Sequence, residues 1–250
     1  FTTKVRYQIQ EKAKMIHLMA QMAANAYLDG KEAKAIFRGM GYTHKFFDVD
    51  GAQCHAVWNK TEYILCFRGT EPDELSDILA DLNAWPRGAM THGLVHSGFV
   101  KECNKLWEQL VVHRSKHIKK TFYITGHSLG AAMATIACSR FEEKEPVEML
   151  TTFGSPRVGT RKFVKNITTP HTRVVNNNDV VTKVPLWLMG YKHHGVLTYI
   201  NFYGNIRTLT FWQMIKDKCR GWRSSALDGI TDHGMHYYLY NLEHSDKKEV

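Results

Sequence analysis

The sequence predicts an α/β fold in which helices cover both faces of a predominantly parallel central sheet. Helical and strand-like patterns alternate through the middle of the chain, at 97–115, 121–125, 128–143, 147–154, 161–166 and 171–179. Such alternation is typical of parallel sheets, because each connection between parallel strands lays a helix against one face. The chain has 250 residues, 44% of them hydrophobic, which is enough for a substantial core. We therefore expect one domain over residues 1–250.

Three further patterns flank this alternating region. Apolar residues at helical spacing predict one long helix from Lys4 to Leu28. Strand-like runs at 55–59 and 63–69 have three residues between them, which predicts a short hairpin. The chain after Asp179 is less regular until a helix-like run at 235–243.

The composition limits the classes of partner. The formal net charge is +9 and the isoelectric point is near 9.2. This balance favours nucleic acid or an anionic lipid surface, although a solubilising excess of lysine explains it equally well. The sequence has neither an RNA-binding aromatic signature nor zinc-finger spacing, so we expect no nucleic-acid partner. It also has no apolar run long enough to predict a transmembrane segment.

The cysteines predict neither a metal site nor a full set of disulfides. They are five in number, and no two form a CxxC pair. Cys66 falls in a strand-like run and Cys138 in a helical pattern. We expect both to be buried thiols.

The first candidate catalytic residue is Ser128, within "YITGHSLGAAMA" at 123–134. In a strand–turn–helix of type G-x-S-x-G, a sharp turn lifts the serine hydroxyl above the sheet. The residues two before and two after the serine must be small, and Gly126 and Gly130 meet this requirement. The simpler alternative is a serine that only caps the helix. The preceding strand and the alanine-rich helix that follows favour the nucleophile.

A serine nucleophile needs a base, which a carboxylate orients. In folds of this kind the chain order is serine, acid, histidine. Asp179 follows the strand-like run in "VVNNNDVVTKVP", so it is expected at the same sheet edge as Ser128. A plain turn residue is the alternative for Asp179. Asp217 and Asp228 fall in charged, less regular sequence and are weaker candidates.

His233 is the candidate base, because it lies in an expected loop before the last helix. His236 is its rival, three residues further on. His171 opens a strand at the wrong end of the sheet, and His193 and His194 are expected on a strand lining the site. His233 is therefore preferred over the other downstream histidines.

Several motifs in one order resemble the class 3 lipases, the fungal-type triacylglycerol lipase family. The motifs are "CFRGTE" (66–71), "DILADLNAW" (77–85), "VHSGFV" (95–100), "YITGHSLGAAMA", "TFGSPRVGT" (152–160), "NNNDVVTKVP" (176–185) and "DHGMHYYLYNL" (232–242). The resemblance covers most of the chain from about Ala24 onwards and implies the α/β-hydrolase fold.

The resemblance also implies a role for each site residue. Ser128 is similar to the family's nucleophile, Asp179 to its acid and His233 to its base. Thr70 resembles the first oxyanion-hole residue, and Leu129 offers the second backbone N–H. Such preorganised donors meet the negative oxygen of a tetrahedral intermediate. Arg68 is expected to be a buried, ion-paired structural residue, and His127 a packing or hydrogen-bonding residue. The chemistry needs no metal or organic cofactor.

Two departures from the family limit what the resemblance implies. Fungal members usually carry stabilising disulfides, which this odd set of cysteines need not form. Four residues separate Asp179 from Val184-Pro185, so the loop after the acid is longer than is common. The family's acyl-chain preference is therefore not carried over to this chain.

The expected activity is a lipase that hydrolyses acylglycerol esters at an oil–water or membrane interface. The alternatives are a phospholipase A1, a general carboxylesterase, or a non-catalytic lipid-binding homologue. The chain begins at Phe1, which suggests a trimmed N-terminus and, with this substrate class, a secreted protein.

Residues 71–93 are a candidate lid within the domain. Leu75, Ile78, Leu79 and Leu82 recur at helical spacing, between Pro72 and Pro86. The resemblance implies a mobile lid here, whereas the periodicity alone fits a plain surface helix.

Overall fold

The computed structural model describes residues 3–70, 85–86, 88–90, 92–207 and 228–245. The candidate lid helix lies outside the described residues, which include only the last part of the 71–93 segment. Among the residues that are described, no helix combines the length and apolar composition needed to cross a membrane.

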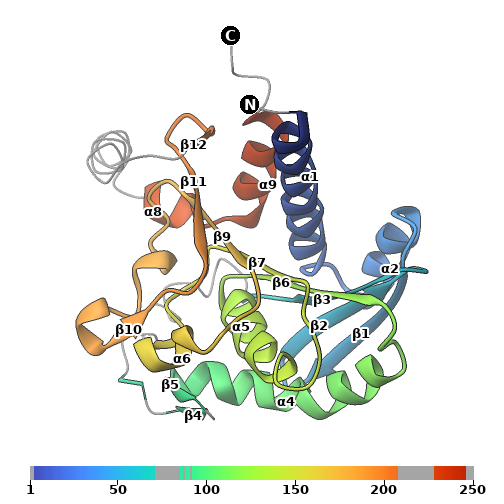
Figure 1. Cartoon of the computed structure of the whole chain (residues 1–250), viewed down its shortest axis with the longest axis horizontal. Helices are drawn as coiled ribbons and strands as arrows, with labels where there is room; N and C mark the ends of the chain where they lie inside the picture. The colour runs from blue at the N-terminus through green and yellow to red at the C-terminus, as the bar shows by residue number, and fades with distance from the viewer. Residues whose placement is uncertain (1–2, 71–84, 87, 91, 208–227, 246–250) are drawn as a thin grey trace.

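An eight-stranded sheet forms the centre of the molecule, in the order β1-β2-β3-β6-β7-β9-β11-β12 (Figure 1). The strands are β1 (Thr43–Val49), β2 (Ala52–Trp58), β3 (Glu62–Phe67), β6 (Thr121–His127), β7 (Met149–Phe153), β9 (His171–Asn176), β11 (Val196–Ile200) and β12 (Ile206–Arg207). The five strands from β3 to β11 run parallel, and β1, β2 and β12 pair antiparallel. The prediction of a predominantly parallel sheet is confirmed.

Helices cover both faces of this sheet, as Figure 1 shows. On one face α4 and α5 pack on inward side chains such as Leu65 and Ile124. On the other face α1, α2 and α9 pack on Ile64 and Val174. Neighbouring residues of β3 thus serve opposite cores, which the alternation of side chains along a strand requires. The helices are α1 (Thr3–Asn25), α2 (Gly30–Gly39), α4 (Ser97–Ser115), α5 (Leu129–Phe141), α6 (Arg161–Lys165), α8 (Asp228–Thr231) and α9 (Met235–His244).

A second, four-stranded sheet lies beside the first, in the order β10-β8-β5-β4. Its strands are two or three residues long, too short to leave a periodic signal in the sequence. Two short 3-10 turns, η2 (Val181–Lys183) and η3 (Trp187–Met189), connect β9 to β10. The strands are β4 (Gly88–Met90), β5 (Gly93–Val95), β8 (Gly159–Thr160) and β10 (Tyr191–Lys192).

Some predicted boundaries are wrong by a few residues. The first helix ends at Asn25 rather than Leu28, and α2 begins only after Asp29 caps it by accepting from two backbone N–H groups. The strand predicted over 171–179 ends at Asn176, because Asn177 adopts a positive φ of 34° and turns the chain. The helix predicted from Ser128 begins at Leu129.

Candidate active site

Ser128 lies at the junction of β6 and α5, in a backbone conformation that serine rarely adopts. Its φ is 58° and its ψ is −127°. A non-glycine residue in this region is strained, and such strain is concentrated at functional sites. The Ser128 backbone N–H donates to the Phe153 carbonyl at 3.1 Å, which ties the turn to β7. The side chain makes no capping hydrogen bond to α5, so the alternative of a simple N-cap is wrong.

Glycines allow this turn to pack against the end of β3. A Cβ on Gly126 would lie 2.5 Å from the Gly130 carbonyl oxygen, and one on Gly130 would collide with the Phe67 carbonyl oxygen. A Cβ on Gly69 would lie 3.1 Å from that of Ser128. The expectation that small residues are required around the serine is therefore confirmed.

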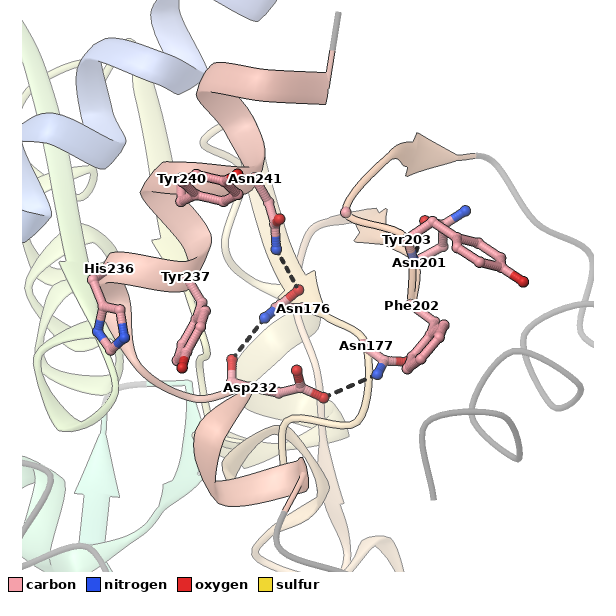
Figure 2. Close-up of a pocket in the computed structure, with 11 residues that line it drawn as sticks. Asn176, Asn177, Asn201, Phe202, Tyr203, Asp232, His236, Tyr237, Tyr240 and Asn241 are labelled. Carbon is pink, nitrogen blue, oxygen red and sulfur yellow. Dashed lines mark hydrogen bonds between the residues drawn. The ribbon is translucent and has the colours of Figure 1, made fainter. Parts of the chain in front are cut away.

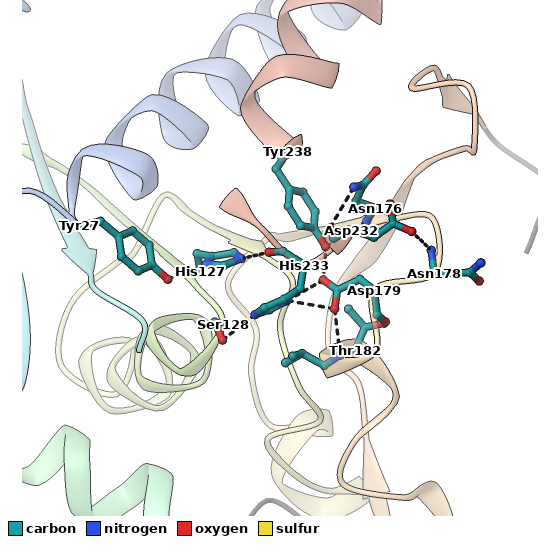
Figure 3. A network of polar contacts seen from close by, with 11 residues as sticks. Tyr27, His127, Ser128, Asn176, Asn178, Asp179, Thr182, Asp232, His233 and Tyr238 are labelled. Carbon is teal, nitrogen blue, oxygen red and sulfur yellow. Dashed lines mark hydrogen bonds and ion pairs between the residues drawn. The ribbon is translucent and has the colours of Figure 1, made fainter. Parts of the chain in front are cut away.

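Ser128, His233 and Asp179 form a buried chain of hydrogen bonds (Figure 3). His233 Nδ1 lies 3.0 and 2.9 Å from the two Asp179 carboxylate oxygens. Because a carboxylate only accepts, Nδ1 carries the proton and donates. The other ring nitrogen, Nε2, is then free to accept from Ser128 Oγ at 2.8 Å. The loop after β9 supplies the acid, and the turn between α8 and α9 supplies the histidine.

Asp179 is ionised although it is fully buried. Burial by itself raises the pKa of the carboxyl group, but His233 and the hydroxyl of Tyr238 outweigh burial and hold it below 3.8. The Tyr238 hydroxyl donates to Asp179 Oδ2 at 2.5 Å, and the Val181 backbone N–H donates to Oδ1 at 2.9 Å. Burial and the nearby Asp179 raise the pKa of Tyr238 well above 10, so Tyr238 stays a donor.

His127 contacts the candidate base through a hydrogen bond and a ring stack. Its Nε2 donates to the backbone carbonyl of His233 at 2.7 Å, which leaves Nδ1 to accept from the Tyr27 hydroxyl at 2.7 Å. The rings of His127 and His233 stack at 4.5 Å between centroids. Burial, and then the neighbouring His233, lower the pKa of His127 to about 3, so His127 stays neutral. The expectation of a packing or hydrogen-bonding residue is confirmed.

Asp232 fixes the loop that carries the acid, beside an aromatic cleft (Figure 2). Its carboxylate accepts from the Asn177 side chain and the Asn178 backbone, both at 3.0 Å. Its backbone carbonyl accepts from the Asn176 side chain at 2.9 Å. A cleft of about 560 Å³ opens next to these residues, between α9 and the turn at 201–204. His236 lines this cleft and packs on Tyr237, whereas His233 contacts Ser128 and Asp179.

Thr70 and Leu129 line one cavity of about 210 Å³, together with Arg68 and Gly69. Leu129 is the first residue of α5, where a helix leaves its backbone N–H groups without intrahelical partners. The packing of Gly69 against Ser128 brings the Thr70 loop next to the nucleophile. Arg68 differs from the expectation of a buried residue: it is partly exposed and donates to the Gln53 side chain at 2.8 Å.

His193 and His194 also differ from the prediction. They lie in the connection between β10 and β11, and the rings of His194 and His171 stack with their Nδ1 atoms 2.9 Å apart. His171 begins β9, as expected. Asp217 lies outside the described residues, and Asp228 begins α8.

Gly154 is a site residue that the sequence reasoning missed. Its φ is 56°, and a Cβ there would lie 2.8 Å from Asp179 Oδ2 and 2.9 Å from His233 Cε1. The glycine thus leaves room for the acid and the base to meet. A signal was present, because Gly154 lies in the motif "TFGSPRVGT". Tyr238 also lies in a motif, "DHGMHYYLYNL", but nothing in the sequence distinguishes it from the other tyrosines there.

Among the described residues, no group of three or more His, Cys, Asp or Glu side chains could hold a metal ion. Cys54, Cys66, Cys103 and Cys138 are free and buried, as expected of Cys66 and Cys138.

Known proteins share this fold and parts of this sequence. Toxin TseL of Vibrio cholerae serotype O1 is 37% identical in an alignment 216 positions long that covers 66% of this chain and 33% of that protein. Secreted mono- and diacylglycerol lipase A of Penicillium cyclopium is 35% identical over 130 residues, 51% of this chain and 39% of that protein. The chain thus spans well under half the length of either relative.

The fold is that of a solved fungal enzyme. The structure of Rhizomucor miehei triacylglyceride lipase superposes with a TM-score of 0.66 at 21% identity, over 76% of this chain and 80% of that one. This likeness shows the α/β-hydrolase fold. The model of the lipase (class 3) family matches residues 64–189, about half of the chain. The chain therefore belongs to the class 3 lipase family.

Proposed function

We propose that the protein is a lipase that hydrolyses carboxylic esters of acylglycerols through Ser128, His233 and Asp179. One observation carries the proposal: in a class 3 lipase chain, a strained serine between β6 and α5 is hydrogen-bonded to a histidine that a buried aspartate holds. This arrangement is the one that activates a serine hydroxyl for acyl transfer.

We assign a step of the reaction to each residue. Neutral His233 takes the proton of Ser128 Oγ through Nε2 as the oxygen attacks the ester carbonyl. The carbonyl oxygen becomes an oxyanion, and we assign its stabilisation to the backbone N–H groups of Thr70 and Leu129, which line one cavity. Asp179 stabilises the imidazolium, and His233 then returns the proton to the departing alcohol. Water then attacks the acyl-serine carbonyl and gives a proton to His233. His233 returns this proton to Ser128 Oγ as the fatty acid leaves.

A phospholipase A1 is the second candidate, because the net charge of +9 suits an anionic phospholipid surface. Both activities use the same three residues and differ in the alcohol that leaves. A non-catalytic lipid-binding homologue is disfavoured, because it would have no use for an intact serine–histidine–aspartate chain.

A substrate panel with a matched serine variant tests the proposal. Fatty-acid release from emulsified triacylglycerol should fall by several orders of magnitude in Ser128→Ala, as removal of a nucleophile does. Ser139→Ala is the control, because this serine lies on α5 and its hydroxyl donates within the helix, to the Ile136 carbonyl. Faster release from dispersed phospholipid than from triacylglycerol would favour the phospholipase. Hydrolysis that survives in Ser128→Ala would reject the assignment.

A further inference from the structure

Three consecutive large apolar side chains project into solvent after the acid loop. Leu186, Trp187 and Leu188 are 48%, 58% and 69% exposed. Isolated exposed leucines are common on protein surfaces, but a contiguous apolar patch marks an interaction site. We call these three residues the apolar turn; it includes the start of η3.

The apolar turn is held firmly at both ends, so its exposure is built into the fold. On the near side, Arg157 holds the chain: its backbone N–H donates to the Val184 carbonyl at 2.8 Å, and its guanidinium donates to the Pro185 carbonyl at 2.9 Å. On the far side, the fully buried Tyr191 begins β10 and pairs with Thr160 of β8. Gly190, at φ 86°, reverses the chain between the two anchors.

The apolar turn follows the candidate acid in the chain, after the carboxyl end of β9. From Asp179 the chain passes through η2 and then reaches the apolar turn. The Val181 backbone N–H, at the start of η2, donates to the Asp179 carboxylate. Arg157, which clamps the apolar turn, belongs to the loop that leaves the same end of β7 as Gly154. In Figure 1 the chain next to β10 lies at the periphery of the fold.

Basic residues surround the apolar turn. Lys183 and Lys192 flank it and are exposed, and the Lys192 ammonium lies 5.8 Å from the ring centroid of Trp187. The charge is one-sided over a longer stretch: residues 157–192 contain seven Lys and Arg but a single acidic residue, the buried Asp179. An apolar projection within a cationic surface is complementary to anionic lipid, which attracts each nearby cation and accepts apolar side chains.

We propose that the apolar turn inserts into anionic lipid surfaces and docks the protein on them, with the candidate triad facing the lipid. The inference extends the proposed function, because it names the headgroup charge that the enzyme would select. Tryptophan favours the boundary between headgroups and acyl chains, where its ring is half in apolar surroundings. The two leucines beside it would reach the acyl region, while Lys183 and Lys192 contact headgroups.

Vesicle binding by the full chain carrying Ser128→Ala tests this without any hydrolysis. Flotation with phosphatidylcholine vesicles, with and without phosphatidylglycerol, should show binding that needs the anionic lipid and weakens as salt rises. Combined Leu186→Ser, Trp187→Ser and Leu188→Ser should weaken binding at least about tenfold. Lys183→Gln with Lys192→Gln should weaken it on anionic vesicles alone. Vesicles with brominated acyl chains should quench part of the tryptophan fluorescence of the bound protein. This quenching should be absent in Trp187→Phe.

Matched variants separate docking from a general loss of apolar or charged surface. Val112→Ser with Ile118→Ser removes two exposed apolar residues at the end of α4, near the start of β6 and so at the opposite sheet edge. Lys116→Gln with Lys119→Gln removes exposed charges there. These controls should bind vesicles as tightly as the parent protein. All variants should have melting temperatures close to that of the parent.

Three outcomes would overturn the inference. They are equal binding to neutral and anionic vesicles, unchanged binding by the triple variant, and a dimer in sedimentation that the triple variant dissociates. The last outcome would assign the turn to a second copy of the chain. Because Ser128→Ala removes the nucleophile, failure to bind vesicles would leave the proposed hydrolysis untouched, and the substrate panel tests that separately.

Discussion

At the scale of single residues, the candidate site depends on a residue with no side chain. Gly154 occupies the position where a Cβ would lie against both Asp179 Oδ2 and His233 Cε1. The acid and base can therefore approach to 2.9 Å only because this position is a glycine. Tyr238 works from the other side, by donating to the same carboxylate.

We predict that Gly154→Ala lowers the rate of ester hydrolysis by about 100-fold, the effect of displacing a catalytic group by about an ångström. Gly41→Ala is the control, because Gly41 also has a positive φ, of 88°, but nothing lies within 4 Å of its added Cβ. Both variants should lose some stability through backbone strain, whereas only Gly154→Ala should lose activity. Steady-state kinetics on a dissolved ester and a urea melt make the comparison. Equal activity in the two variants would contradict the role given to Gly154.

Motifs predicted the reactive residues better than the residues that support them. Ser128, Asp179 and His233 were chosen from a turn motif and chain order, and the structure brings them into hydrogen bonding; their catalytic role stays a prediction. Tyr238 could not be chosen, because it is one of three tyrosines in the last helix and the sequence does not say which of them contacts Asp179. Such a contact depends on where α9 docks, which local patterns do not encode.

At the scale of elements, the site depends on how closely α5 packs against the end of β3. The helix begins directly after Ser128, so any shift of α5 moves the nucleophile and the N–H of Leu129 together. Gly130 sets the distance between α5 and β3, because a Cβ added there would meet the backbone of Phe67 and Arg68.

Gly130→Ala should therefore lower the free energy of unfolding by about 1–3 kcal/mol, as overpacking of a tight contact does. A Cβ there would lie 2.7 Å from the Arg68 carbonyl carbon, which is backbone and cannot rotate away. Gly39→Ala, at the end of α2 with nothing within 4 Å, is the matched control and should be neutral or slightly stabilising. Urea unfolding followed by circular dichroism measures both. A variant as stable as the control would show that α5 can shift freely.

Long periodic elements were predicted well, and short ones were not. The helix expected over 97–115 is α4, with the same bounds. The small sheet was missed because β8 and β10 have two residues each, and its pairing is decided by tertiary contacts. The sequence analysis also did not predict α2 and β1, which lie between the first helix and the hairpin.

At the scale of the whole molecule, buried neutral histidines make the fold sensitive to acid. Burial, as the largest cause, lowers the pKa of His55 and His127 to about 3 and that of His113 to about 4. The pKa of His171 also lies well below 6.5, for the same reason. In the unfolded chain these side chains would titrate near their ordinary pKa of about 6.5.

We predict that stability is highest above about pH 6.5 and falls steadily as the pH drops towards 4. In this window the unfolded chain binds protons that the folded protein cannot, so acid favours unfolding. Each such histidine contributes a slope of about 1.4 kcal/mol per pH unit. Urea midpoints across the range measure the effect. Midpoints that stay constant from neutral pH to about pH 5 would show that these histidines are protonated without unfolding.

The central claim is that His233 activates Ser128 as a nucleophile. A fluorophosphonate probe followed by peptide mass spectrometry tests it most directly, because the probe reacts only with an activated serine. The predicted result is one label per chain, on Ser128. The label should be lost in His233→Ala, because His233 contacts Ser128. It should be kept in His236→Ala, because His236 lines the neighbouring cleft. A label on another serine, or labelling of Ser128 at the parent rate in His233→Ala, would contradict the claim.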